Sequence, residues 1–400
     1  MSNDSPRARL GVYQDGPFHP LDTPEGRRIA PDPVDAPFLR FVNEVGQQYG
    51  SLVVFARTVA TGEADPRLLL PAGVRVVDLP DYGNLRRLPA VARASVRTSV
   101  AFWRGLDEVD TVWAFGPHPF ELLLVLLATM RRRRVVLGVR QDTPAYFRSR
   151  LPSPRWKPVL AGVRALDGLN RLLARRLPAT VVGEAAAGRY ASRRGRVLAM
   201  TPSLVAAADI VASPAEHDWS GEIDLFTVGR IDGEKNPLLL VEMVAALERK
   251  RPGRYLLRWA GVGPLADDVR RRADELGIGD RIELLGYVPF GPQLLELYRG
   301  AHALVHVSLT EGVPQVLVEA FASGTPIVAT DVGGVGSALE DGRAGLLVPP
   351  ADLEALTAAI VRLSDDAELR ARLVARGLEL ARERTLEVEA GRVATFLRNL

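Results

Sequence analysis

The chain has 400 residues, of which 47% are hydrophobic and 25% charged, and its formal net charge is +3. This composition is ordinary for globular proteins, and the length suggests two or three domains. The absence of cysteine excludes disulfides, thiol catalysis and cysteine-ligated metals, and it fits a reducing cytoplasm. The amino-terminal residues lack the layout of a signal peptide, and the longest apolar run, residues 122–130, is too short to cross a bilayer. We therefore expect a cytoplasmic protein.

The first half alternates between short apolar strands and helices, which is typical of a doubly wound α/β sheet. Strands are expected at residues 9–13, 52–56, 74–79, 110–115 and 135–139, with helices at 38–49 and 121–130. Residues 20–36 are rich in Pro and Asp and are expected to form a long loop.

Two loops of this half carry candidate binding residues. Gly16 follows the first strand, where a glycine lets a phosphate approach the backbone. Asp15 and His19 could orient an acceptor hydroxyl or merely cap the turn. His118 lies beyond the carboxyl end of a strand, where open α/β sheets bind ligands, although the residue alone fits a structural role equally well.

Arginine is clustered in the first half, at residues 131–134, 148–176 and 189–196. Residues 155–177 also show a basic amphipathic pattern, which indicates one or two helices. Such clusters attract an anionic membrane surface, nucleic acid or a polyanionic acceptor, or they form ordinary solvated faces. Because no nucleic-acid motif accompanies them, we expect no nucleic-acid partner. Peripheral contact with the inner face of the membrane stays open.

Residues 204–220 contain scattered Pro, Ser and Ala and are expected to form a linker. A second alternation of strands and helices begins after them. The strand at 223–228 ends in G-R-I-D-G-E-K-N-P, and a helix follows at 237–250. In that loop Arg230 offers a planar fork and Lys235 a mobile point charge, which together suit a diphosphate.

A glycine pair after the next strand needs separate interpretation. Gly261, Gly263 and Ala266 match the dinucleotide pattern G-x-G-x-x-A, with Glu283 about twenty residues further on. The pattern stands in the middle of the chain rather than at the start of a domain, so we interpret it as tight packing between strand and helix.

The most informative stretch is residues 303–336, which predicts strand, loop, helix, strand and loop. Glu311 lies in the first loop and Glu319 in an otherwise apolar helix, where a carboxylate needs nearby donors. Sugar and ribose hydroxyls would supply them, and the free N–H groups at the start of the helix suit phosphate oxygens. The alternative is a solvated loop Glu and a helix Glu paired to an Arg.

The sequence contains no Walker A loop, Gly-x-Ser-x-Gly elbow or Asp-x-Asp pair. The Asp-x-Asp pair commonly holds a metal against a nucleotide diphosphate. Here Arg230, Lys235 and the helix N-terminus would have to balance that charge, so we expect neither a metal nor a cofactor.

The second half resembles the retaining glycosyltransferases of family 4, in the GT-B superfamily. The residues that carry the resemblance are V-G-R-I-D-G-E-K-N-P, G-V-G-P-L, R-I-E-L-L-G-Y-V-P, E-G-V-P-Q-V-L-V-E-A-F-A-S-G-T-P-I-V-A-T-D-V-G-G and G-L-L-V-P-P. They occur in the order and spacing of that family over about 130 residues. The first half resembles the family only in its alternating pattern and in the loops at Gly16 and His118.

The resemblance implies a role for each candidate residue. Glu311 would contact hydroxyls of the transferred sugar and Glu319 the ribose, while Arg230 and Lys235 would bind the diphosphate. The base would meet the backbone of Tyr287 and Val288. The diphosphate would also meet the backbone of Gly312, Val313, Pro314, Gln315 and Val316. From the first domain, Gly16 would approach the diphosphate and His118 would lie near the donor sugar.

The sequence departs from the family in four places. Many members have Phe where Val313 stands and Asn where Gln315 stands, and these differences are mild. The usual Gly-Gly of the first loop is here D-G-P-F, and the His-Asp often found after a later strand is R-Q-D at residues 140–142. Because these last two lie on the acceptor side, the resemblance does not specify the acceptor.

The expected fold is α/β of the GT-B kind, with two doubly wound Rossmann-like domains that face each other across a cleft. The domains would be residues 1–203 and 221–385, joined by the linker 204–220, with a helix at 386–400 crossing back to the first domain. The expected activity is metal-independent, retaining transfer of a hexose-type sugar from a UDP- or GDP-sugar to a hydroxyl acceptor. The alternatives are a GT-B nucleotide-sugar epimerase or hydrolase, and a non-catalytic GT-B subunit that binds a partner or membrane.

Overall fold

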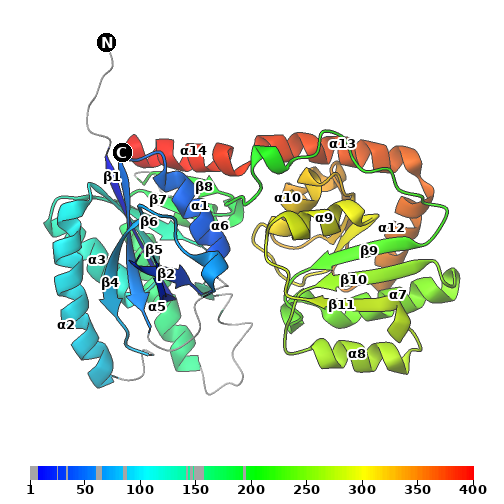
Figure 1. The fold of residues 1–400 in the computed structure, drawn as a ribbon, viewed down its shortest axis with the longest axis horizontal. Coiled ribbons are helices and arrows are strands. Elements are labelled where there is room, and N and C mark those ends of the chain that lie inside the picture. Colours follow the sequence, from blue (N-terminus) through cyan, green and yellow to red (C-terminus); the bar gives the residue numbers. More distant parts are fainter. Residues whose placement is uncertain are drawn as a thin grey trace, which may run out of the picture. The chain divides into compact units, whose positions relative to one another are not determined.

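The computed structural model forms two compact units, each a sheet flanked by helices (Figure 1). Unit 1 comprises Met1–Pro202 and Glu389–Leu400, and unit 2 comprises Ser203–Val388. The residues that the structure describes are 8–24, 26–32, 35–59, 65–83, 88–140, 143–144, 147, 157–191 and 195–400.

The sheet of unit 1 is parallel except for β2, which pairs antiparallel with β1. Its strand order is β4-β3-β1-β5-β6-β7-β8. The strands are β1 (Arg9–Thr23), β2 (Gly26–Pro31), β3 (Ser51–Thr58), β4 (Arg75–Pro80), β5 (Thr111–Gly116), β6 (Arg134–Val139), β7 (Ala179–Val182) and β8 (Val197–Met200). The central strands are buried on both faces, as their continuous apolar runs require.

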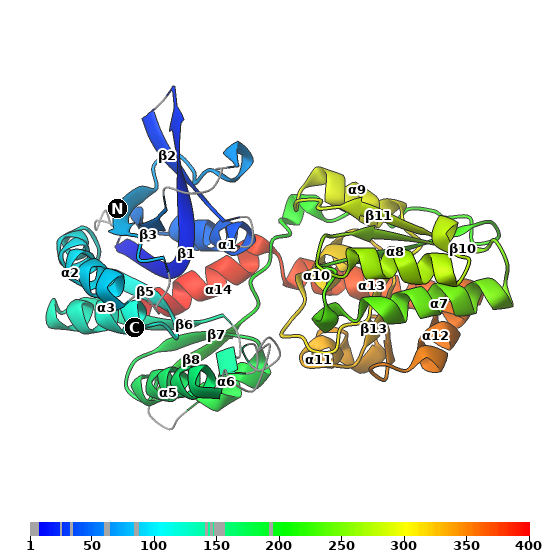
Figure 2. The ribbon, with the colours of Figure 1, turned by 90° about the horizontal axis from the view of Figure 1, so that it is seen from below.

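Helices cover both faces of this sheet, as Figure 2 shows. Among the described residues they are α1 (Ala36–Gly46), α2 (Leu88–Gly105), α3 (Pro119–Met130), α5 (Lys157–Leu173), α6 (Glu184–Tyr190) and the larger part of α14 (Leu386–Arg398). The core beneath α2 is aromatic, because Phe102 contacts both Tyr13 and Phe55 edge to face with ring centroids 5.5 Å apart. Helix α14 joins unit 1 partly through Arg392, which donates to the carbonyl of Ala199.

The structure differs from the sequence prediction at residues 20–36, where a long loop was expected. Instead β1 continues to Thr23 and forms a hairpin with β2, from Phe18 opposite Pro31 to Thr23 opposite Gly26. Pro20 suggested a loop, but this part of β1 lies past its last pair with β3, where one side of the strand needs no ladder partner. Proline is tolerated in such an edge position, which explains the error.

The sheet of unit 2 has strand order β11-β10-β9-β12-β13-β14, and every pair in it is parallel. Its strands are β9 (Ile223–Val228), β10 (Tyr255–Ala260), β11 (Ile282–Gly286), β12 (Ala303–His306), β13 (Ile327–Thr330) and β14 (Leu346–Val348). Its helices are α7 (Pro237–Lys250), α8 (Ala266–Glu275), α9 (Pro292–Gly300), α10 (Gln315–Ala322), α11 (Val335–Ala338), α12 (Leu353–Asp365) and α13 (Ala367–Glu383).

The segment predicted as a linker packs as part of unit 2. Val205 is fully buried in the core beside α10, and its carbonyl accepts from the N–H of Leu386 at 2.7 Å. The N–H of Val211 donates to the carbonyl of Ala322 at 2.9 Å. Val205 and Val211 therefore bond this segment to α14 and α10, although its composition alone indicated a linker.

Both sheets reverse their direction of winding at one place. In unit 1 the chain runs outward from β1 to β3 and β4, and then outward the other way from β5. In unit 2 the reversal lies between β9 and β12. Open α/β sheets bind ligands beyond the carboxyl ends of the strands at such a switch point. The topology therefore marks the loops after β1 and β5, and those after β9 and β12.

The core of unit 2 gives a first prediction. Phe226 of β9 is fully buried and meets Tyr298 edge to face, with ring centroids 5.0 Å apart. We expect Phe226→Ala to lower the free energy of unfolding by about 3–5 kcal/mol through lost burial and a cavity, and Phe226→Leu to cost clearly less. Urea unfolding of unit 2, followed by tryptophan fluorescence, measures both. The exposed Leu238→Ala is the control, and an equal loss in all three variants would contradict the packing described.

Candidate functional site

The loop after β9 holds Lys235 in a short 3-10 turn, Gly233–Lys235. The Asp232 carboxylate begins this turn by accepting from the N–H groups of Glu234 at 3.2 Å and Lys235 at 3.3 Å. Asn236 follows in the left-handed region at φ 50°, and α7 begins at Pro237. This local structure fixes the backbone from which the Lys235 side chain extends.

The loop after the neighbouring strand β12 brings Glu311 to Lys235. The Lys235 ammonium donates to Oε1 of Glu311, and the same oxygen lies 3.1 Å from Nε2 of His306. His306 ends β12 and is buried, and its Nε2 also lies 3.2 Å from the Ser308 hydroxyl. A backbone hydrogen bond of 2.9 Å from Leu309 N–H to the Glu234 carbonyl ties the two loops together.

These contacts keep Glu311 ionised. Burial alone would raise its pKa, but the hydrogen bond from His306 and the positive charge of Lys235 outweigh burial and lower the pKa to about 2. At neutral pH the side chain is therefore a permanent hydrogen-bond acceptor. A carboxylate with so low a pKa is a poor general base.

Two glycines of the loop after β13 shape the Glu311 loop. A Cβ atom on Gly333 would lie 1.9 Å from the carbonyl oxygen of Glu311, and one on Gly334 would lie 2.2 Å from that of Gly312. The N–H of Gly334 donates to the Gly312 carbonyl at 2.9 Å. Only glycine permits this approach, and Gly333 also has a positive φ of 56°.

The glycines of the G-V-G-P-L-A turn serve a similar purpose beside the Lys235 loop. A Cβ on Gly261 would lie 1.9 Å from the carbonyl oxygen of Gly229, and the N–H of Ile231 donates to the Val262 carbonyl at 3.0 Å. The glycines of the dinucleotide pattern thus allow one loop to pack closely against another, whereas the sequence interpretation was close packing between a strand and a helix.

Glu319 lies in α10 and is buried. The Tyr298 hydroxyl donates to its Oε2 at 2.8 Å, so its partner is a tyrosine rather than the arginine considered from the sequence. Burial raises the pKa of Glu319 to about 7, and the hydrogen bond from Tyr298 offsets only part of that rise. The pKa values of Glu311 and Glu319 are therefore shifted in opposite directions, although both residues were predicted as hydroxyl acceptors.

The other predicted residues of unit 2 lie on loops at the same edge of the sheet. The guanidinium of Arg230 is half-exposed and pairs with Asp232 and Glu234, each at 3.1 Å. Tyr287 and Val288 follow β11, with the Tyr287 side chain exposed. The remaining predicted residues form the turn and first helical residues of α10, namely Gly312, Val313, Pro314, Gln315 and Val316.

In unit 1, His118 is the N-cap of α3. Its Nδ1 accepts from the N–H of Phe120 at 3.3 Å, so in the neutral ring the proton resides on Nε2. Nε2 lies 3.2 Å from the Tyr82 hydroxyl and 3.4 Å from Oδ2 of Asp15. Burial lowers the pKa of His118, more than the Asp15 charge raises it. His118 is thus a neutral ring with both nitrogens engaged.

Asp15 is the centre of this cluster at the β1–β5 switch point. It accepts from the hydroxyls of Tyr13 at 3.1 Å and Tyr82 at 2.7 Å, and Nε of Arg57 lies 3.6 Å from its Oδ1. The sequence offered Asp15 as a residue that could orient an acceptor hydroxyl, and the structure shows it engaged in this network instead of capping a turn.

Gly16 lies within β1 rather than after it. A Cβ there would lie 2.5 Å from Oδ2 of Asp35, whose other carboxylate oxygen pairs with Arg140 at 2.7 Å. The glycine therefore makes room for the Asp35–Arg140 ion pair. Asp142, two residues beyond Arg140, lies outside the described residues.

Sequence reasoning missed four residues of these clusters: Arg57, Tyr82, His306 and Tyr298. His306, Arg57 and Tyr82 stand at or just after the carboxyl ends of strands, the signal that singled out His118, but nothing in their sequence neighbourhood marked them. Tyr298 carries no such signal, because its contact with Glu319 joins two different helices.

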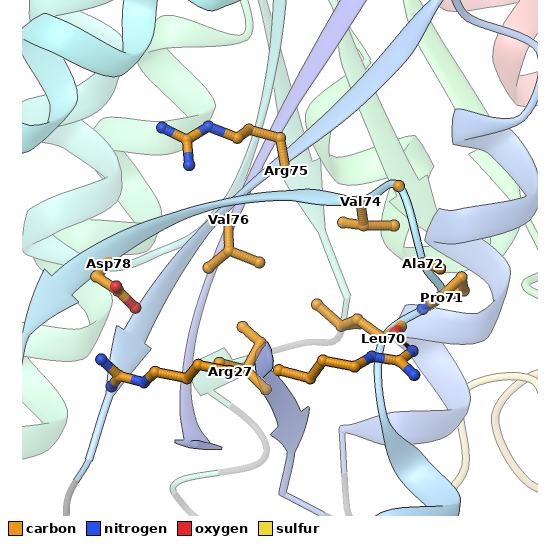
Figure 3. A pocket seen from close by; sticks show the side chains of 11 residues that line it. Arg27, Leu70, Pro71, Ala72, Val74, Arg75, Val76 and Asp78 are labelled. Carbon is orange, nitrogen blue, oxygen red and sulfur yellow. Dashed lines mark hydrogen bonds between the residues drawn. The ribbon is translucent and has the colours of Figure 1, made fainter. Parts of the chain in front are cut away.

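Unit 1 also contains a cavity of about 520 Å³ beside β2 and the edge strand β4. Figure 3 shows Arg27, Arg75 and Asp78 among the side chains around it. Arg75 pairs with Glu108 at 3.0 Å, and Asp78 accepts from the Thr58 hydroxyl at 2.7 Å. None of the residues predicted from the sequence lines this cavity. Within the described part of the chain, no group of three or more His, Asp or Glu is arranged to hold a metal.

Comparison with solved structures establishes the class of fold. Sucrose-phosphate synthase from Thermosynechococcus elongatus superposes with a TM-score of 0.69 at 19% identity, over 98% of this chain and 99% of that one. Anabaena Alr3699/HepE, solved in complex with UDP and glucose, has a TM-score of 0.68 at 17% identity, over 98% and 100%. The chain has the GT-B fold, with two Rossmann-like domains.

The family follows from the second half of the chain. The model of the family described as glycosyl transferases group 1 matches residues 210–379, so this region belongs to that family and the resemblance predicted from its motifs is confirmed. A D-inositol 3-phosphate glycosyltransferase of Corynebacterium glutamicum is 38% identical over 160 residues, or 39% of this chain and 38% of that protein. The match thus spans well under half of the relative's length.

The environment of Glu311 predicts a pH effect. Its pKa is lower in the folded protein than the usual value of about 4.3, so its stabilising contribution is complete above that pH and is lost as the pH falls toward 2. Lys235→Met should raise the pKa of Glu311 by about one unit or more, because an opposite charge is removed. Carboxyl NMR titration measures this, with Lys250→Met as control. An unchanged Glu311 pKa in Lys235→Met would refute the assignment.

For Glu319 we expect the opposite dependence of stability on pH. Its pKa is about 7 in the folded protein, so the folded state binds the extra proton and its stability falls as the pH rises from about 4.3 to 7. Glu319→Gln should remove this penalty. The free energy of unfolding of the variant, relative to wild type, should then be higher at pH 8 than at pH 4 by up to about 3 kcal/mol. Urea unfolding at both pH values measures it, beside the exposed Glu296→Gln. Parallel pH profiles for wild type and Glu319→Gln would count against a buried, protonated Glu319.

Proposed function

We propose that this protein is a retaining glycosyltransferase of family 4, which transfers a hexose-type sugar from a UDP- or GDP-sugar to a hydroxyl acceptor. The observation that carries the proposal is the Lys235–Glu311 pair, with His306 behind it, at the β9–β12 switch point. A cationic side chain and an ionised acceptor in contact at this place match a donor with an anionic diphosphate and a hydroxyl-bearing sugar.

Glu311 would bind hydroxyls of the transferred sugar. Its low pKa keeps both oxygens as acceptors at neutral pH, which suits hydroxyl donors and excludes it as a source of protons. The acceptor's proton must then go elsewhere. We propose that the departing diphosphate oxygen takes it on the same face of the sugar, while the bond from C1 to that oxygen breaks and the bond from C1 to the acceptor oxygen forms.

The main demand of this reaction is stabilisation of negative charge on the leaving diphosphate. Lys235, Arg230 and the N–H groups at the start of α10 would provide it, without a metal ion. Both cations pair with carboxylates in this structure, Lys235 with Glu311 and Arg230 with Asp232 and Glu234. A diphosphate carries more charge than one carboxylate, so it competes for these cations when it binds.

The other residues of the two sites would serve binding. Glu319 would accept from the ribose and the backbone of Tyr287 and Val288 would meet the base. In unit 1, Gly16 would lie near the diphosphate. His118 would lie near the donor sugar, where its Nε2–H is available only if the contacts with Tyr82 and Asp15 rearrange. The acceptor would bind on the side of unit 1.

The names of similar proteins support this class of substrate. One relative of the second half is named a D-inositol 3-phosphate glycosyltransferase, and Alr3699/HepE, which shares the fold, has been solved with UDP and glucose. The matched region contains Lys235, Glu311 and Glu319, so the comparison bears on the donor half of the reaction. The proposed acceptor side, in unit 1, lies outside the matched residues 210–379, so the family match says nothing about the acceptor.

The proposal predicts which nucleotides bind and which side chains their binding requires. Calorimetric titration with UDP, GDP, ADP and NAD, with and without EDTA, should show EDTA-insensitive binding of UDP or GDP. Lys235→Ala should weaken that binding about 10- to 100-fold, because a charged hydrogen bond to phosphate is lost. Glu311→Gln should leave nucleoside diphosphate binding nearly intact and abolish sugar transfer. The exposed Lys250→Ala is the matched control for charge.

Other outcomes would select the alternatives. Turnover of the nucleotide sugar without any acceptor would indicate a hydrolase or epimerase. Binding of NAD alone would overturn the donor assignment and return attention to the G-V-G-P-L-A turn. Absence of binding by all four nucleotides would favour a non-catalytic subunit.

A further inference from the structure

Helix α2 carries an apolar stripe that faces solvent. Val96, Val100 and Trp103 follow one another at spacings of four and three, so they lie on one side of the helix. All three are exposed, Val96 by 68% of its surface. The opposite side, with Phe102 and Ala94, is buried against the sheet and accounts for the packing of α2. The exposed stripe therefore contributes nothing to the core of unit 1.

Helix α3 extends this apolar surface. Leu126 and Met130 are four residues apart and are exposed by 57% and 62%. Helices α2 and α3 pack against each other, and they lie side by side in both views of the fold (Figures 1 and 2). The guanidinium of Arg131, just after α3, lies 4.0 Å over the ring of Trp103. This contact connects the carboxyl-terminal ends of α2 and α3.

The charges around this surface are almost all positive. Helix α2 contains Arg93, Arg97 and Arg104 and no acidic residue, and α3 is followed by Arg131, Arg132, Arg133 and Arg134. Asp107 neutralises part of this charge through ion pairs with Arg131 at 2.5 Å and Arg133 at 3.8 Å. We call the five exposed apolar side chains and these seven arginines the α2–α3 face.

The arginines of α2 differ from those of an ordinary solvated helix of the same protein. On α8, Arg270 and Arg271 each pair with an aspartate three residues earlier. Arg93, Arg97 and Arg104 form no ion pair with any residue that the structure describes. Unpaired cations beside exposed apolar side chains indicate a surface whose counter-charge comes from outside the chain.

We propose that the α2–α3 face docks on a membrane surface rich in anionic phospholipid. The apolar stripe would enter the boundary between headgroups and acyl chains, and the arginines would meet lipid phosphates. A second copy of this chain is disfavoured, because two such faces would bring like charges together. A nucleic acid would satisfy the arginines but leave Val96, Val100 and Leu126 without an apolar partner.

This docking would be peripheral. Within the part of the chain that the structure describes, no helix has the length and apolar character needed to cross a bilayer. The inference stands on the surface of unit 1 and does not depend on which sugar or nucleotide unit 2 binds. Its test therefore needs no substrate.

The charge test uses flotation of the full-length protein with vesicles of phosphatidylcholine and phosphatidylglycerol in equal parts, at low and high salt. Wild type should float with these vesicles at low salt and not with phosphatidylcholine alone. Arg93→Gln/Arg97→Gln should lower the partition coefficient about 10- to 30-fold. Arg270→Gln/Arg271→Gln removes the same net charge from α8 and should bind as wild type does.

The apolar test uses Val96→Ser/Val100→Ser, with Leu238→Ser/Val388→Ser as a control for exposed residues elsewhere. Only the first pair should weaken flotation. Brominated lipid should also quench tryptophan fluorescence in wild type, and Trp103→Phe should remove most of that quenching. Circular dichroism of each variant would verify that it is folded.

Four results would overturn the proposal. They are no flotation of wild type at low salt, equal binding to neutral vesicles, undiminished binding of the α2 arginine variant, and quenching that survives Trp103→Phe. Binding to heparin or DNA without vesicle binding would instead identify a soluble polyanion. Concentration-dependent dimerisation lost in Val96→Ser/Val100→Ser, without vesicle binding, would identify a second copy as the occupant.

Discussion

The ion pair between Lys235 and Glu311 is the interaction on which the arrangement of unit 2 at its switch point depends. It joins loops that follow two adjacent parallel strands, and each loop also has ordering contacts of its own. Asp232 orders one loop, and the close approach of Gly333 and Gly334 orders the other. His306 completes the site from the end of β12. Several backbone constraints therefore place one cation and one anion where a topological rule locates ligands.

The two carboxylates of this region, Glu311 and Glu319, show how burial and bonding partners give similar residues different pKa values. Both are largely enclosed, and burial by itself would raise the pKa of each. Glu311 has a cation and a histidine as partners and stays ionised, whereas Glu319 has only a tyrosine hydroxyl and takes up a proton near neutrality. For these two carboxylates the charged partner outweighs desolvation and the neutral donor does not. In unit 1 the outcome is the reverse, because burial outweighs the charged partner Asp15 and lowers the pKa of His118.

The use of arginine also differs between parts of the chain. In α8 arginines pair with nearby aspartates, and near Asp35 an arginine completes a pair beside a glycine. On α2 they stand beside apolar side chains without such partners. A surface cation that is paired contributes little to association, because its field is already cancelled nearby. An unpaired set has a field that extends about a Debye length and attracts an anionic surface.

The sequence was enough to predict the alternation of strands and helices, the family motifs of the second half and the loops that carry Lys235, Glu311 and His118. These are local signals, since periodicity, glycine positions and strand ends can be read along the chain. It misassigned the β1–β2 hairpin, because prolines indicate a loop unless an edge position is known. Three contacts could be found only in the folded protein: Glu311 with His306, Glu319 with Tyr298, and Asp15 with Tyr82. Those contacts join elements distant in sequence, and ionisation follows from what surrounds a side chain in space.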